Sequence, residues 1–126
     1  MNTRTILIVD DSAAMRAMLV AVIEPLCECQ IVEATSGFEA LRLLPRERID
    51  LILTDINMPD INGLELISYL RSNPNYSSIP VFIISTESSL NDMEKGKQLG
   101  AAEYVVKPFD PVHLQHLITS YLEPAR

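Results

Sequence analysis

Short apolar runs alternate with segments of helical periodicity along the whole chain. Runs without polar alternation occupy residues 6–9, 51–53, 81–84 and 104–106, and a weaker run, suited to an edge strand, occupies 31–32. Strands show this pattern when helices cover both faces of a parallel sheet. A segment with apolar residues at helical spacing follows each run. The pattern therefore predicts an α/β fold with one five-stranded parallel sheet between two helical layers.

The helical segments carry start and stop signals. In chain order, the starts are Asp11 or Ser12, the Ser36/Glu39 capping-box pattern, Asn62, Ser88 or Ser89, and Asp110 followed by Pro111. The first segment keeps its helical spacing as far as Leu26, and Gly100 ends the fourth. That fourth helix has only Leu90, Met93 and Leu99 as strong core candidates. We therefore expect it to be lightly anchored.

Composition argues against nucleic-acid-binding and membrane-spanning proteins. The chain has 126 residues, of which 48% are hydrophobic and 21% charged, with a formal net charge of −7. Such an acidic chain is a poor candidate for binding nucleic acid through phosphate contacts, and it has no apolar stretch of membrane-spanning length. Five strand–helix units leave no room for a linker or a second domain, so residues 1–126 are expected to form one domain.

Cysteine and histidine add little chemistry. Cys27 and Cys29 are too few for a disulfide framework, and bridging across two residues is strained, so we expect reduced thiols. With no signal-peptide pattern at the N-terminus, this predicts a cytoplasmic location and no membrane partner. His113 and His116 stand three residues apart on the last helix without further ligands. A surface or packing role is favoured for them over a metal site.

Polar residues follow the apolar runs where each strand should end. Asp10 and Asp11 come after the first run, Asp55 after the third, Ser85 after the fourth and Lys107 after the fifth. The carboxyl ends of parallel strands lie at one edge of the sheet, where open α/β folds bind ligands. We therefore expect these five side chains to meet in one crevice.

Three carboxylates in one crevice repel one another. Two unit charges about 4 Å apart repel by roughly 4 kcal/mol at an effective dielectric constant near 20. Lys107 offsets one negative charge and a divalent cation would offset the other two. Oxygen ligands in a site open to water favour Mg²⁺. The alternative is a surface acidic cluster without a ligand.

The residues Asp10-Asp11, Asp55, Ser85 and the segment 104–109 together resemble the receiver domain of two-component response regulators, over essentially the whole chain. Segments 10–16, 57–59 and 63–66 are most similar to the stand-alone, CheY-like chemotaxis receivers. The resemblance implies a doubly wound, flavodoxin-like sheet with strand order 2-1-3-4-5, which is a documented example of this fold.

The resemblance also implies roles for the acidic cluster and Lys107. Asp55 would accept a phosphoryl group from a histidine kinase. Asp10, Asp11, Asp55 and the backbone carbonyl of Asn57 would hold Mg²⁺. Lys107 would contact the Asp55 carboxylate and then a phosphoryl oxygen. Such a protein is not an enzyme in the usual sense, because it catalyses only its own phosphotransfer and dephosphorylation.

Further implied roles concern signal output. The Ser85 hydroxyl would move toward the phosphoryl group and Tyr104 would follow, altering a target-binding face on the fourth helix, fifth strand and fifth helix. Without the resemblance, Tyr104 is an ordinary strand aromatic. The bond before Pro108 would be cis. Asn57, Thr86 and Glu87 would form the rim that sets the lifetime of the phosphoryl group.

Thr86 departs from the alanine or glycine usual in the family, which leaves open which hydroxyl moves. Ser85 is preferred, because adjacent strand residues face opposite ways.

Two other classes of function remain open at this point. A Mg²⁺-dependent phosphohydrolase of the haloacid-dehalogenase type also uses a strand-end aspartate. It places a second aspartate two residues later, where this chain has Asn57, and its paired aspartates come late in the sequence. A phosphorylation-independent adaptor would keep the site without using it. The Asn57 position and the early paired aspartates argue against the hydrolase, and the complete acidic set argues against the adaptor.

Overall fold

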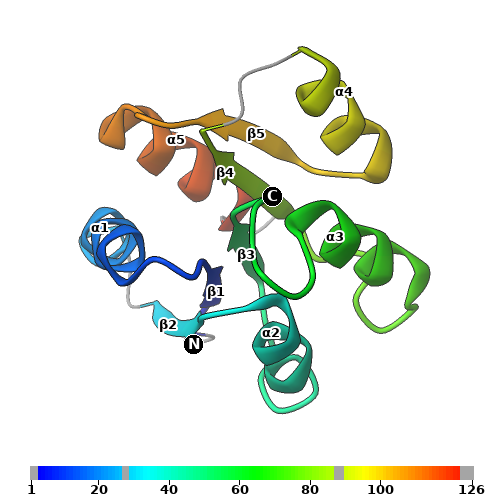
Figure 1. Cartoon of the computed structure of the whole chain (residues 1–126). Helices are drawn as coiled ribbons and strands as arrows, with labels where there is room; N and C mark the ends of the chain where they lie inside the picture. Colours follow the sequence, from blue (N-terminus) through cyan, green and yellow to red (C-terminus); the bar gives the residue numbers. More distant parts are fainter. Residues whose placement is uncertain (1–2, 27–28, 87–89, 123–126) are drawn as a thin grey trace.

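In a computed structural model, which describes residues 3–26, 29–86 and 90–122, strands and helices alternate along the chain (Figure 1). The strands are β1 (Thr5–Val9), β2 (Gln30–Ala34), β3 (Leu51–Thr54), β4 (Val81–Ser85) and β5 (Glu103–Val106). The helices are α1 (Ala13–Ile23), α2 (Gly37–Leu43), α3 (Gly63–Ser72), α4 (Leu90–Leu99) and α5 (Pro111–Leu122).

All strand pairs are parallel, and the order across the sheet is β2-β1-β3-β4-β5. This confirms the predicted fold class and strand order. The chain moves from β1 to β2 in one direction and from β3 to β5 in the other. The direction therefore reverses between β1 and β3, and a crevice is expected at their carboxyl ends.

Two apolar clusters cover the two faces of the sheet. Successive strand residues point to opposite faces, so in β1 Ile6 and Ile8 join one cluster while Leu7 and Val9 join the other. Helices α1 and α5 cover the first face, and α2 and α3 contribute buried residues to the second (Figure 1). Every β1, β3 and β4 residue is buried, which explains their continuous apolar runs.

Two helix details differ from the sequence predictions. Helix α1 ends at Ile23 rather than Leu26, because Pro25 has no backbone N–H to continue the helical ladder. In α4, Leu90 is 82% exposed and is not a core residue. The buried residue of α4 is Gly96, and at 3.6 residues per turn Leu90 lies about 120° around the helix from it. Met93 and Leu99 flank Gly96 more closely and are half-buried.

The capping residues proposed for α4, Ser88 and Ser89, lie outside the described residues. The expectation of reduced thiols is wrong for Cys29, which is disulfide-bonded. It lies in the irregular connection directly before β2. Cys27 lies outside the described residues. None of the described helices is both long and apolar enough to cross a bilayer.

Candidate functional site

The parallel register brings Asp10 and Asp55 side by side. Val9 of β1 pairs with Thr54 of β3, and each aspartate is the next residue in its chain segment. The Asp55 amide donates a hydrogen bond to the Val9 carbonyl at 3.0 Å. The two carboxylates therefore leave neighbouring strands at the edge where the winding direction reverses.

Asp10, Asp11 and Asp55 form a cluster in which one carboxylate oxygen from each lies within 4.8 Å of the others. Asp10 is buried, Asp55 is half-buried and Asp11 is exposed. The cluster thus runs from the interior to solvent. An ion could enter from the Asp11 side.

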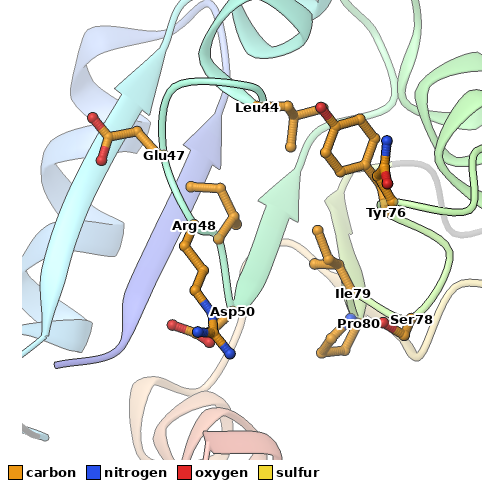
Figure 2. Close-up of a pocket in the computed structure, with 10 residues that line it drawn as sticks. Leu44, Glu47, Arg48, Asp50, Tyr76, Ser78, Ile79 and Pro80 are labelled. Carbon is orange, nitrogen blue, oxygen red and sulfur yellow. The ribbon is translucent and has the colours of Figure 1, made fainter. Parts of the chain in front are cut away.

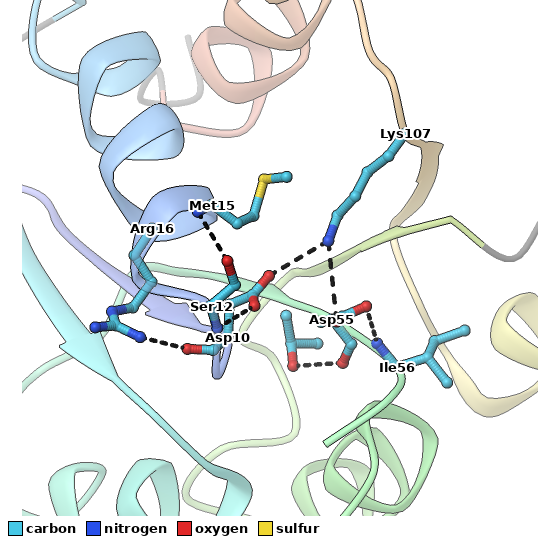
Figure 3. Close-up of polar contacts among 8 residues, drawn as sticks. Asp10, Ser12, Met15, Arg16, Asp55, Ile56 and Lys107 are labelled. Atoms are coloured by element: carbon cyan, nitrogen blue, oxygen red, sulfur yellow. Dashed lines mark hydrogen bonds and ion pairs between the residues drawn. The ribbon is translucent and has the colours of Figure 1, made fainter. Parts of the chain in front are cut away.

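Lys107 reaches this cluster from β5 (Figure 3). Ser85 pairs with Val106 in the sheet, and the Lys107 amide donates to the Ser85 carbonyl at 2.8 Å. The ammonium Nζ lies 3.4 Å from Asp10 Oδ2 and 3.9 Å from Asp55 Oδ2. The following peptide bond, Lys107–Pro108, is cis, as the resemblance implied.

The surroundings of Asp55 disfavour the ionised form of its carboxyl group. Burial raises its pKa above the usual value of 3.8; Lys107 opposes this shift, Asp10 and Asp11 add to it, and a hydrogen bond from the Ile56 amide opposes it. That amide donates to Asp55 Oδ1 at 2.8 Å. The carboxylate is thus fixed through one oxygen while the other faces Lys107.

The donor set fits a hard divalent cation. Three carboxylates supply oxygen atoms close together, and Lys107 balances only one of their charges. Carboxylate oxygens are the ligands that Mg²⁺ and Ca²⁺ take in proteins. The acidic cluster can therefore bind a metal ion, and its excess negative charge favours one.

The remaining predicted residues lie around this cluster or beyond it. Ser85 is fully buried, whereas Thr86 is exposed, as expected for neighbours that face opposite ways. Asn57 is exposed, and Glu87 lies outside the described residues. Tyr104, on β5, is half-buried and packs with the cluster of the α2–α3 face. A Cβ atom added to Gly96 would lie 3.2 Å from Tyr104 Cδ2, so the tyrosine ring lies directly against α4.

Two residues near the site were given no functional role from the sequence. Gly63 begins α3, and a Cβ there would lie 2.2 Å from the Asp55 carbonyl oxygen. Its signal was a glycine inside a helix start, where other residues form helix better. Arg16 donates to the Asp10 carbonyl at 2.8 Å. Its signal was a single charged residue in the otherwise apolar segment of α1.

A separate cavity of about 360 Å³ opens at the opposite, amino-terminal edge of the sheet (Figure 2). Its lining includes Arg48, Asp50 and Tyr76. Asp50 already accepts a hydrogen bond from the Thr5 amide at 2.8 Å and pairs with Arg4. This carboxylate holds the start of β1. Glu47, Arg48 and Asp50 line the cavity, but the described residues there form no group of three acidic, histidine or cysteine side chains close enough to hold a metal ion. His113 and His116 are both exposed on α5.

Comparisons with known proteins agree with this arrangement. The family model of the response regulator receiver domain matches residues 6–119. The chain is 34% identical over 118 residues to a "Chemotaxis protein CheY homolog" of Campylobacter jejuni, covering 93% of this chain and 91% of that protein. It is also 34% identical to the "Transcriptional regulatory protein YvrH" of Bacillus subtilis, covering 98% of this chain and 51% of that protein.

Among solved structures, the chemotaxis protein CheY4 of Vibrio cholerae superposes with a TM-score of 0.87 and 31% sequence identity. The match covers 96% of this chain and all of that one. Fold, sequence and the acidic edge of the sheet therefore lead to one conclusion: the chain belongs to the response regulator receiver domain family and is CheY-like.

Proposed function

We propose that this receiver domain is a chemotaxis-type signalling switch in which Asp55 accepts a phosphoryl group from a histidine kinase. The observation that carries the proposal is the clustering of Asp10, Asp11 and Asp55 with the Lys107 ammonium at the carboxyl edge of the sheet. Family membership supports a phosphorylation-dependent role. The identity of the acceptor follows from how the three carboxylates differ.

Asp55 is better placed to react than its neighbours. Both oxygens of Asp10 are engaged, Oδ1 by the Ser12 amide at 2.9 Å and Oδ2 by Lys107 at 3.4 Å. Asp11 is exposed, so water solvates its charge. Asp55 Oδ2 lies 3.9 Å from the Lys107 ammonium, farther than the 3.4 Å contact of Asp10, while the Ile56 amide fixes Oδ1.

The transfer forms one bond and breaks one. An Asp55 oxygen bonds to phosphorus, the phosphorus–nitrogen bond of the donor phosphohistidine breaks, and the released imidazole takes up a proton. Asp10, Asp11, Asp55 and the Asn57 backbone carbonyl would hold Mg²⁺, which when bound neutralises charge on the phosphoryl oxygens. Lys107 stabilises a phosphoryl oxygen through its ammonium. Asn57, Thr86 and Glu87 would set how long the phosphoryl group survives.

Labelling with radioactive acetyl phosphate and Mg²⁺ tests the acceptor. Wild-type protein is expected to take up about one phosphoryl group and Asp55→Asn none. Asp50→Asn is the matched control. Asp50 lies directly before β3 and Asp55 directly after it, so the same substitution is made at the opposite end of the strand. Asp50→Asn should be labelled as wild type is.

Circular dichroism must show that both variants fold. Label that persists in Asp55→Asn would place the acceptor elsewhere. Absence of label in wild type would favour an adaptor, and fast turnover of small phosphate esters would favour a hydrolase.

For the output, we propose that the Ser85 hydroxyl donates a hydrogen bond to a phosphoryl oxygen and that Tyr104 moves with it, changing the face formed by α4, β5 and α5. Helix α4 supports this, because only Gly96 is buried along it. Its outer side carries a groove of about 440 Å³ lined by Leu90, Asn91, Met93, Glu94 and Lys97. A helix held by so few contacts can take two positions of similar energy, and the exposed groove offers apolar surface to a protein target.

Nuclear magnetic resonance with the phosphoryl analogue beryllofluoride tests this output. With Mg²⁺ present, the ring resonances of Tyr104 are expected to shift, while those of Tyr76, at the other edge of the sheet, stay unchanged. Ser85→Ala should reduce the Tyr104 shift without preventing labelling of Asp55. An unchanged Tyr104 in fully labelled wild type would refute the proposed output. A cytoplasmic location is part of the proposal, since the kinase donor draws on ATP.

A further inference from the structure

The backbone and side chain of Asp10 are held from several directions, and Figure 3 shows the contacts from Ser12, Arg16 and Lys107. The Asp10 amide donates to the Ala34 carbonyl of β2 at 3.1 Å. The Asp10 carbonyl accepts from Arg16 Nη1 at 2.8 Å, and the Asp10 side chain accepts from the Ser12 amide at 2.9 Å. The turn that carries two of the three clustered carboxylates is therefore fixed by side-chain as well as backbone contacts.

Arg16 is itself well fixed. Its side chain is 15% exposed, and its Nε lies 3.1 Å from Glu33 Oε1 on β2. One guanidinium thus connects α1, the end of β1 and β2. The planar fork of arginine is suited to two such contacts at once. Glu33, whose side chain is 46% exposed, offsets the positive charge of Arg16 only in part.

The contact at the Asp10 carbonyl bears on Asp11. A peptide unit is planar, so the direction of the Asp10 carbonyl also sets the direction in which the chain continues into Asp11. The Asp11 carboxylate is exposed, and few surrounding atoms restrict where it points. Its approach to Asp10 and Asp55 therefore depends on the backbone that Arg16 holds.

We propose that Arg16 is a positioning residue for the cation site: it orients the Asp10–Asp11 peptide so that both carboxylates face Asp55. The inference rests on the proposed function, since that function needs the cation. Arg16 also carries a positive charge, which by itself repels a cation. Positioning and charge consequently predict opposite effects when Arg16 is replaced.

Titration calorimetry with Mg²⁺ alone separates these effects. Arg16→Met keeps the aliphatic bulk and is expected to weaken Mg²⁺ binding about 10-fold or more, the usual cost of losing a group that orients metal ligands. A charge-only role would instead tighten binding. Arg46→Met is the matched control, because Arg46 is exposed in the α2–β3 connection. This control should bind Mg²⁺ as wild type does.

Two more variants refine the test. Glu33→Gln leaves the Arg16–Asp10 contact in place and should change the affinity less than Arg16→Met does. Arg16→Lys keeps the charge but loses the fork, so it should also weaken binding, and it replaces Arg16→Met if that variant does not fold. Independently of any cation, the Asp11 amide resonance should shift in Arg16→Met and stay nearly unchanged in Glu33→Gln.

The failures are distinguishable. If wild type binds no Mg²⁺, the proposed function is wrong. If wild type binds Mg²⁺ and the Arg16 variants bind it equally well or more tightly, only the positioning role is wrong.

Discussion

At the scale of the residue, Gly63 shows how closely α3 approaches the proposed acceptor. The Gly63 amide donates to the Ile56 carbonyl at 2.8 Å. A Cβ there would lie 2.2 Å from the Asp55 carbonyl oxygen and 3.1 Å from Ile56 Cα. These obstructing atoms belong to the backbone and cannot rotate away. The helix can begin here only because residue 63 has no side chain.

We expect Gly63→Ala to destabilise the fold by about 1–3 kcal/mol, the usual cost of overpacking, and to lower the rate of Asp55 labelling because the end of β3 must move. Denaturant unfolding and labelling measure the two effects. Gly96→Ala is the comparison: its nearest obstructions are side-chain atoms of Ile83 and Tyr104, and alanine gains about 1 kcal/mol in a helix interior. Equal losses in the two variants would contradict this reasoning.

At the scale of the element, the first residues of α2 are hydrogen-bonded to a loop that is distant in sequence. Asp60, in the β3–α3 loop, accepts hydrogen bonds from the amides of Gly37 and Phe38 at 3.2 and 2.9 Å. Burial would raise the pKa of Asp60, but the hydrogen bonds from Phe38, Ile61, Gly37 and Ser36 outweigh it and lower the pKa to about 2. The loop after Asp55 is thereby tied to the N-terminus of α2.

Asp60→Asn should lower the melting temperature by a few degrees at neutral pH, because an amide offers one acceptor oxygen instead of two. A carboxyl with a depressed folded-state pKa stabilises the protein above its unfolded value of 3.8 and loses that contribution as the pH falls toward about 2. The difference from wild type should therefore vanish over that interval. Melting curves across pH measure it, with Glu94→Gln on α4 as a control for loss of one exposed charge. A constant difference would show that Asp60 acts otherwise.

The element scale also shows where sequence reasoning succeeds and fails. Helix starts were predicted at Asp11 or Ser12, at Ser36 and at Asn62. The structure selects Ser12 for the first, and the side chains of Ser12, Ser36 and Asn62 each accept an amide hydrogen bond from their helix. Leu90 was misassigned to the core because spacing alone does not say which side of a short helix faces the sheet. The side of α4 that faces the sheet is the one that carries Gly96. This side packs against Ile83 and Tyr104, which lie on other elements, so the helical spacing alone could not identify it.

At the scale of the whole molecule, the fold brings three carboxylates close together, and their environment disfavours the ionised form of Asp55. Burial is the main cause of the raised pKa of Asp55, and Asp10 and Asp11 add to it. A carboxyl whose pKa is raised on folding destabilises the protein increasingly as the pH rises from 3.8 through the higher folded-state value. The ionised Asp55 carboxylate therefore costs stability at neutral pH until a cation binds.

Without divalent ions at pH 7, Asp55→Asn should melt about 2–6 °C above wild type, the shift that about 1 kcal/mol produces in a domain of this size. Mg²⁺ should reverse the order, because at about 100-fold above its Kd a ligand of the native state adds about 2.7 kcal/mol. Melting curves with and without Mg²⁺ test both statements. A less stable Asp55→Asn in the absence of Mg²⁺ would show that the carboxylate contributes to stability rather than reducing it.

Much of this architecture could be predicted from the sequence. Continuous apolar runs indicated the parallel sheet, and the polar residues after them indicated one shared edge, because parallel strands end together. The support of Asp10 by Arg16 and the contact of Gly63 with Asp55 could not be predicted. Both contacts depend on how closely α1 and α3 pack against the sheet. The order of apolar and polar residues does not give the distances between these helices and the strand ends.

The pairing of Val9 with Thr54 limits how this chain can vary in length. Deleting one residue from β3 would turn every later side chain of that strand to the opposite face, so Asp55 would point away from its partners while the apolar content hardly changed. Insertions among relatives should accordingly collect in the connections at the far edge, and strand lengths between the two apolar layers should stay constant.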